Sequence, residues 1–161
     1  MGLLFDPDKR IEDFIFNVSG YAERADDLTP VFEDTILPKI MRREQRMFET
    51  RGASSGVYWS PLKGSTVERK KRNPDVTHIF DPLRETDALM KSLSERGARY
   101  QVLDVDQDGF TFGTSHPAAG FHQEGTGRMR ARPPLVIPKK HAEEYIGDIN
   151  DFIFGEEADN A

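Results

Sequence analysis

Glycines and prolines between residues 51 and 82 limit how much regular structure this chain can form. Proline lacks a backbone donor, and glycine loses more conformational entropy than other residues when it is ordered. The pattern predicts that a helix ends near residue 50 and that an extended, mostly irregular segment follows to about Asp81. This pattern consists of the cluster Arg51-Gly52-Ala53-Ser54-Ser55-Gly56 and, after it, Pro61, Gly64, Pro74 and Pro82.

Two helices are predicted before this segment. Apolar residues recur at steps of three and four over Asp8–Ala25, as on one face of an amphipathic helix. Thr29-Pro30 offers an N-cap and a proline for the first turn of a second helix. Pro38 should kink that helix or split it into a short turn and a long basic helix from about Pro38 to Thr50.

The second half of the chain mixes helices with short strands. Apolar spacing predicts a short helix over Glu85–Leu93 and a closing helix over Lys139–Phe154. Between them, alternating apolar residues flank an Asp-Gln-Asp-Gly turn, which predicts a β-hairpin from Tyr100 to Phe112. Residues 115–132 are expected to form a long loop, and Leu135–Ile137 a short apolar strand.

The fold class predicted from these elements is α+β. It combines N-terminal helices, a small antiparallel sheet with a long extended loop, and a C-terminal helix. With 161 residues, the chain fits one ordinary domain. We expect this domain to span residues 1–155 and residues 156–161 to form an acidic, flexible tail.

Composition excludes several kinds of chemistry. The chain has no Cys, which excludes disulfides, thiol catalysis and thiolate metal sites. No stretch approaches the roughly 20 apolar residues that cross a bilayer. The N-terminus MGLLFDPDKR also lacks the basic-then-apolar order of a signal peptide. We therefore expect no membrane partner and a protein that is made and kept in the cytosol.

Charge is distributed unevenly along the chain, whose net charge is −6. Residues 1–38 carry nine acidic and three basic side chains, whereas residues 39–72 carry ten basic and three acidic ones. A basic segment on an acidic protein suits contact between complementary surfaces of neighbouring subunits. A charged face in contact with solvent is the alternative interpretation, and the pattern does not separate the two.

The sequence Asp104-Val-Asp106-Gln-Asp108-Gly109 matches the opening of an EF-hand calcium loop. The twelfth position should hold a bidentate acid but is Ser115, and the flanking residues alternate as strands rather than helices. We favour a hairpin turn in which Asp side chains cap backbone donors and Gly109 has a positive φ. A calcium-binding module is kept as an alternative hypothesis.

No catalytic motif is present. The chain lacks a His-Glu-x-x-His helix and a phosphate-binding loop that ends in Gly-Lys-Ser/Thr, so we expect no enzymatic activity and no cofactor. His116 and His122 lie near Glu124 in one loop, which is the only plausible group of metal ligands. A flexible loop holds a metal poorly, so surface or interface histidines are favoured.

The run Arg69-Lys70-Lys71-Arg72 could contact phosphates. No interleaved aromatic residues accompany it, so stacking on single-stranded bases is not indicated. A solvated turn or a contact with protein is favoured. A small DNA-binding or DNA-processing protein, using residues 63–72 and the loop Arg128–Arg132, remains the alternative.

Three ordered blocks resemble the phage virion-morphogenesis family, the tail-completion or head-tail joining proteins typified by the G protein of phage Mu. The resemblance covers about Asp27 to Phe154. The first block is Phe48–Thr66 with Trp59-Ser-Pro61-Leu62, and the second is Leu83–Leu93. The third comprises Gly113-Thr114, His122-Gln-Glu-Gly125-Thr126 and Ala131-Arg132-Pro133. The chain departs from the family at Asp87, where glycine is common, at Ala118–Phe121, where a Tyr-Ala step precedes His-Gln, and at Pro134, where an aromatic residue is common.

The resemblance implies a structural subunit of the virion neck or tail end, assembled in the host cytoplasm. Copies of the chain would form a ring, often six-fold, that contacts other neck, connector or tail-tube proteins. DNA that passes through the channel is a further candidate partner. Residues expected at such interfaces are Trp59, Arg69, Lys70, Lys71, Arg72, His122, Arg128, Arg130 and Arg132.

Two of these interface assignments have alternatives. Trp59 beside Pro-Leu is typical of a residue that fills a domain core. The three arginines from Arg128 to Arg132 could instead pair with acids of the same subunit. We expect the run His122–Pro134 to order at an interface, with Arg132 nearest the folded body and His122 to Arg128 reaching outward.

Overall fold

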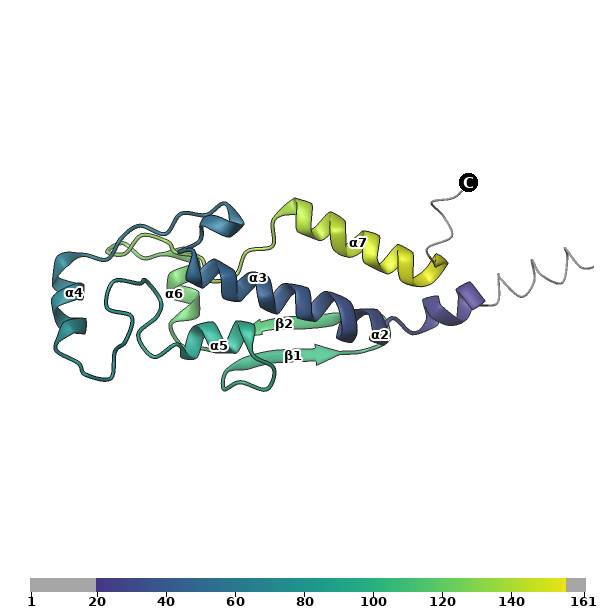
Figure 1. The fold of residues 1–161 in the computed structure, drawn as a ribbon, viewed down its shortest axis with the longest axis horizontal. Coiled ribbons are helices and arrows are strands. Elements are labelled where there is room, and N and C mark those ends of the chain that lie inside the picture. The colour runs from purple at the N-terminus through teal and green to yellow at the C-terminus, as the bar shows by residue number, and fades with distance from the viewer. Residues whose placement is uncertain (1–19, 156–161) are drawn as a thin grey trace, which may run out of the picture.

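A computed structural model describes residues 20–155 of the chain. The molecule is elongated, and its longest helix pair, α3 and α7, runs along the long axis (Figure 1). Residues 20–26 are helical, whereas the earlier part of the predicted helix Asp8–Ala25 and the predicted tail 156–161 lie outside the described residues. The elements that follow are α2 (Thr29–Val31), η1 (Phe32–Ile36), α3 (Leu37–Glu49), η2 (Ala53–Ser55), α4 (Gly64–Lys71), α5 (Ala88–Ser94), β1 (Gln101–Val105), β2 (Phe110–Thr114), α6 (Ala119–Glu124) and α7 (Lys139–Phe154).

These elements confirm the predicted α+β class. The sheet consists of two antiparallel strands, and the closing helix α7 has the predicted bounds. Among residues 20–155, no helix is long and apolar enough to cross a membrane.

The helix that contains Pro38 is not split, contrary to the prediction. It runs without a break from α2 through η1 into α3. The segment η1 just before the proline is π-helical, and the Leu37 N–H donates to the carbonyl of Phe32, five residues earlier. A wider turn is a known way for a helix to accommodate a residue that cannot join the regular ladder. The chain therefore passes Pro38 by changing the local helix type.

The hairpin packs one face against this helical run. Val105, Phe110 and Phe112 contact a buried group formed by Val31, Phe32, Ile36 and Ile40. Phe32 and Phe110 meet edge to face with ring centroids 5.2 Å apart. In the turn, Asp106 Oδ1 accepts hydrogen bonds from the N–H groups of Asp108 and Gly109, as predicted for a capped turn. Gly109 does not have the predicted positive φ, because the side-chain bonds hold the turn without it.

Helix α5 encloses a second buried group with α3. Leu89, Met90 and Leu93 of α5 pack with Met47 and Phe48 of α3. The helix starts at Ala88 rather than at the predicted Glu85, because Asp87 has a left-handed φ of 56° that ends the irregular segment before it. Burial of these apolar side chains, each worth about 1.5–3 kcal/mol when complete, stabilises the middle of the molecule.

Two predicted local structures are wrong, and a third is incomplete. Residues 51–81 are mostly irregular, as predicted, but they contain helix α4, and the predicted loop 115–132 contains helix α6. Both helices are short and start beside Gly or Pro residues, which hid them in a pattern of breakers. Leu135–Ile137 is not a strand. Instead, the side-chain amide of Gln123 replaces a strand partner, since its Nε2 donates to Leu135 O (3.1 Å) and its Oε1 accepts from Leu135 N (3.4 Å).

Helix α7 lies along α3, where polar contacts add to the packing of Tyr145, Ile149 and Phe152 against the buried group around Phe32. Lys39 Nζ donates to both carboxylate oxygens of Asp148 at 2.8 and 2.7 Å. Arg43 donates to Glu144 at 2.6 Å and to the Tyr145 hydroxyl at 2.8 Å. The hydrogen bonds to these carboxylates raise the pKa of Lys39. Helix α7 therefore pairs with two of the four basic side chains of α3, whereas Arg42 and Arg46 stay exposed.

Glu44 is a buried acid in α3, with 2% of its surface exposed. Its Oε2 atom has no hydrogen-bond partner. Burial raises the pKa of Glu44 to about 8, because the charged carboxylate loses its hydration. In the folded state Glu44 thus keeps its proton up to a higher pH than it does in the unfolded chain.

Replacing Glu44 with Gln should stabilise the protein most at alkaline pH. Because the folded pKa is raised, the wild-type chain should lose stability as pH rises from about 4.5 to about 8. Glu44→Gln should gain on the order of 2–4 kcal/mol at pH 8 and little at pH 5. Urea unfolding at both pH values would measure this difference, with the exposed Glu95→Gln as control. Equal gains at both pH values would contradict a buried, protonated Glu44.

Candidate binding cleft

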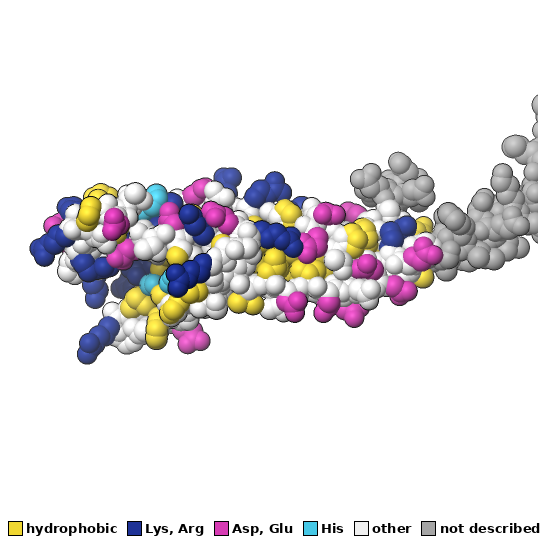
Figure 2. Space-filling view, turned by 90° about the horizontal axis from the view of Figure 1, so that it is seen from below, with side chains coloured by type: hydrophobic (Ala, Val, Ile, Leu, Met, Phe, Trp, Pro, Cys, Tyr) yellow, Lys and Arg dark blue, Asp and Glu magenta, His cyan; other side chains and the backbone are white. Residues whose placement is uncertain are grey.

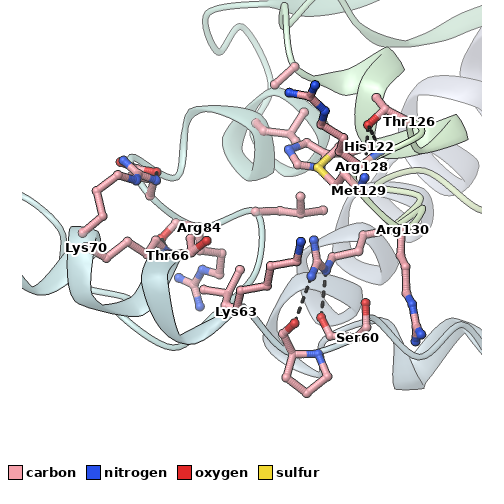
Figure 3. A pocket seen from close by; sticks show the side chains of 18 of the residues that line it. Ser60, Lys63, Thr66, Lys70, Arg84, His122, Thr126, Arg128, Met129 and Arg130 are labelled. Atoms are coloured by element: carbon pink, nitrogen blue, oxygen red, sulfur yellow. Dashed lines mark hydrogen bonds and ion pairs between the residues drawn. The ribbon is translucent and has the colours of Figure 1, made fainter.

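A cleft of about 980 Å³ is lined by residues of α4, of α6 and of the segments beside them (Figure 3). It lies toward the end of the molecule at which α4 is found (Figure 1). Its walls come from residues 60–70, residues 83–89, α6 with the residues before it, and the loop 126–132. The lining is strongly basic, with Glu85 as its single acidic residue. The basic side chains in the lining are Lys63, Arg69, Lys70, Arg84, Arg128, Arg130 and Arg132, together with His116 and His122.

The cleft brings together the two basic segments that the sequence separates. Residues 63–72 form α4 and its end, and the loop Arg128–Arg132 forms the opposite wall. Arg132 joins the walls, because its Nε donates to Ser60 O at 2.7 Å and its Nη2 to Pro61 O at 3.0 Å (Figure 3). Burial lowers the pKa of Arg132, although the guanidinium stays protonated at any ordinary pH. Arg132 lies nearest the folded body, as expected.

Trp59 supports this wall from the protein core. It is 5% exposed and meets the Phe48 ring edge to face, with centroids 5.1 Å apart. Its indole N–H donates to Pro133 O at 3.1 Å. Trp59 is therefore unavailable for direct contact with a partner in this fold. Gly52 is required beside it, because φ is 87° and an added Cβ would lie 1.9 Å from Val57 O.

The run Arg69-Lys70-Lys71-Arg72 divides into different roles. Arg69 makes a bidentate pair with Glu85 at 2.7 and 2.8 Å, and Lys71 pairs with Glu68 at 2.8 Å. Lys70 is buried, and its Nζ donates to the carbonyls of His78 and Asp81, both at 2.8 Å. Desolvation lowers the pKa of Lys70. Of these four side chains, Lys70 is thus structural and inaccessible to a partner.

Arg84 and Glu85 also line this site, although no sequence motif predicted them. Arg84 Nε donates to Asp87 Oδ1 at 2.9 Å, and its Nη2 lies 2.9 Å from His78 Nε2. Only the spacing of three between Arg84 and Asp87 hinted at this pair. Glu85 accepts hydrogen bonds from Arg69 of α4, 16 residues earlier in the chain. No local sequence pattern indicates a contact at this separation.

His122 does not reach outward as predicted. It lies on α6, and the N–H of Arg132 donates to its carbonyl at 2.8 Å. Its Nδ1 atom is buried without a hydrogen-bond partner. Burial lowers the pKa of His122, and the nearby Arg132 and His116 add to this effect. The imidazole therefore favours its neutral form at physiological pH.

Three cations of the lining remain available for a ligand. The side chains of Lys63, Arg128 and Arg130 are exposed and have no hydrogen bond or ion pair within residues 20–155. In Figure 3, Lys63 points into the space between the walls, whereas Arg130 turns outward along the rim. Such an arrangement can bind carboxylate or phosphate groups through charge-assisted hydrogen bonds.

Metal chemistry has no comparable arrangement. In the part of the chain that the structure describes, no group of three His, Asp or Glu side chains could hold a metal ion. At the EF-hand-like sequence, Asp106 Oδ1 is already occupied by the turn.

Comparison with known proteins adds no further assignment. The chain matches no protein-family model, no curated protein and no solved structure. Inference about function therefore depends on the sequence pattern and on the geometry of the cleft.

The neighbouring lysines 70 and 71 should differ sharply in their contribution to stability. Lys70→Met removes a charged donor and leaves two carbonyls unsatisfied, so we expect a loss of about 2–4 kcal/mol of unfolding free energy. Lys71→Met removes only an exposed pair and should change stability by at most about 0.5 kcal/mol. Chemical denaturation of both variants measures the contrast. Similar losses in the two variants would contradict the structural role of Lys70.

Proposed function

We propose that this chain is a structural, non-enzymatic subunit of the phage neck or tail end. In this proposal, copies of the chain close into a ring that completes the tail and joins it to the head connector. The observation that supports it most is tertiary: the three sequence blocks that resemble the virion-morphogenesis family pack together as one unit.

Contacts between the blocks are specific. Trp59 of the first block packs with Leu89 and Leu93 of the second. Arg132 of the third block donates to Ser60 of the first. Ser92 Oγ of the second block donates to Thr114 Oγ1 of the third at 2.8 Å. Separated segments that together specify one tertiary unit are what a real family pattern requires, so this packing supports the resemblance.

Exposed aromatic side chains favour a protein partner. Tyr58 is 83% exposed and lies two residues before Ser60 of the cleft lining, and Phe121 is 63% exposed and precedes His122 in α6. Aromatic residues are enriched in protein interfaces because they bury a large area. The proposed partners are other copies of the chain, neck or connector proteins and the tail tube, and the proposed location is the virion.

Loss of the gene should leave heads and tails unjoined. In this proposal the ring forms the surface that joins heads to tails, and no other subunit takes over this role when the ring is absent. Electron microscopy of lysates and the infectious titre would measure the defect. Complementation with the wild-type chain and with the exposed control variant Lys140→Glu should restore tailed particles. Normal tailed particles after the deletion would exclude this function.

DNA binding is the second candidate, because the lining of the cleft is basic. The structure places the two basic segments named for this role on facing walls of the cleft. Lys63, Arg128 and Arg130 could each neutralise one phosphate.

Affinity for duplex DNA should then fall steeply with salt. With three phosphate contacts, the logarithm of the binding constant should fall with that of salt concentration with a slope of about −3. Arg128→Glu with Arg130→Glu should weaken binding at least about tenfold, whereas Lys140→Glu should not. These exposed arginines are better targets than buried Lys70. Fluorescence anisotropy at low salt is the measurement, and no detectable binding would dismiss this candidate.

A further inference from the structure

We propose that the basic cleft of one copy binds an acidic tip on the next copy, so that the chain assembles head to tail. The acidic tip consists of Asp26, Asp27, Asp106 and Asp108. This inference rests on the proposed ring of copies and names the surfaces that would join them.

The acidic tip is a built feature of the fold. The N–H of Leu28 donates to Gln107 O at 3.0 Å, and Thr29 Oγ1 donates to Asp106 O at 3.3 Å. These bonds place the residues before α2 beside the hairpin turn. All four aspartates are exposed, and within residues 20–155 none forms an ion pair. Two of them cap backbone donors, which leaves the carboxylates of Asp26 and Asp108 available for a partner.

The basic cleft has the complementary excess of charge. Arg69 and Arg84 are neutralised by acids of their own chain, and Arg132 and Lys70 are occupied by carbonyls. The available cations are the three described above, Lys63, Arg128 and Arg130, which line one opening. A carboxylate that entered would gain bidentate bonds from arginine without displacing an internal pair.

The two surfaces lie at opposite ends of the molecule. Strands β1 and β2 run along the long axis, with α4 and α6 at one end and the hairpin turn near α2 at the other (Figure 1). In Figure 2, Lys and Arg side chains gather around a hollow near one end, whereas Asp and Glu dominate the other half. Helix α3 alone, with 13 residues, separates the ends by about 20 Å.

That separation requires two copies for the contact. A rigid hairpin turn cannot fold back to the cleft of its own chain. A contact between two different surfaces of identical chains repeats from copy to copy and closes into a ring when the rotation allows it.

The lining of the cleft favours a peptide segment over DNA. Leu62, Leu83 and Met129 contribute apolar surface between the cations. A folded turn can bury such surface, whereas a phosphate backbone uses only the charges. The chain also carries a net charge of −6, which opposes approach to DNA and leaves attraction confined to the cleft.

Reversing charge at one end and then at the other tests this contact. The cleft variant carries Arg128→Glu and Arg130→Glu, and the tip variant carries Asp26→Lys and Asp108→Lys. Alone, each has like charges on both surfaces, so self-association should weaken at least about tenfold relative to wild type. Mixed in equal amounts, the two variants have complementary surfaces again, and association should return. Sedimentation velocity of the full chain at about 50 mM and about 500 mM salt measures both effects.

Matched controls separate charge from folding. The variant Lys91→Glu with Lys140→Glu changes the net charge by as much as the cleft variant does, at exposed positions outside the cleft, and should associate like wild type. Circular dichroism and melting temperature should match for all variants, since none of the changed side chains forms a described hydrogen bond or ion pair.

Three results would overturn the inference. They are a wild-type chain that stays monomeric at all concentrations, association that survives both reversals, and a mixture that does not recover. A cleft variant that loses affinity for a DNA duplex but keeps its self-association would assign the cleft to DNA. The particle assay distinguishes these failures from failure of the proposed function. If deletion of the gene leaves heads and tails unjoined, the proposed role as a neck subunit stands and only the proposed interface is rejected.

Discussion

The guanidinium of Arg132 donates to the carbonyls of Ser60 and Pro61, 72 and 71 residues earlier in the chain. Beside it, the Trp59 indole donates to Pro133 O, and its ring packs on Phe48. These contacts attach two irregular segments to the core around α3 and α5. Both segments lack regular backbone pairing, so side-chain bonds to their carbonyls replace it. This junction fixes the position of one wall of the cleft relative to the other.

The basic side chains around the junction fall into two groups: those that have hydrogen-bond partners within the chain and those that have none among the described residues. Those near the core, Lys70 and Arg132, donate to backbone carbonyls and are partly desolvated, which lowers the pKa of each. The exposed cations Lys63, Arg128 and Arg130 have no hydrogen bond or ion pair within residues 20–155 and carry the unpaired positive charge of the cleft. Buried cations need partners because desolvation of a charge is costly. Exposed cations are hydrated, so they need no partner within the chain and stay available to bind a ligand. The same basic composition thus serves both folding and recognition.

Local patterns predicted the hairpin, helix α7 and the apolar side of α5 well. These elements have strong alternation or helical spacing, or a turn that caps itself, as Asp106 does. The patterns failed where a short helix begins among glycines and prolines, as in α4 and α6. They also failed at Leu135, where Gln123 supplies hydrogen bonds that a strand partner would otherwise provide. At Pro38, the helix changed its hydrogen-bonding step to one of five residues instead of breaking.

The sequence by itself determined the α+β class, the order of the main elements and the presence of two basic segments, because apolar spacing and turn residues act over a few positions. Only the tertiary structure decided that these segments face each other, that Trp59 and Lys70 are buried, and that Arg84 and Glu85 belong to the cleft. Burial and pairing depend on which distant segments meet. Here Arg132 and Trp59 select those neighbours through bonds to carbonyls, which every residue carries and which leave no signature in the sequence.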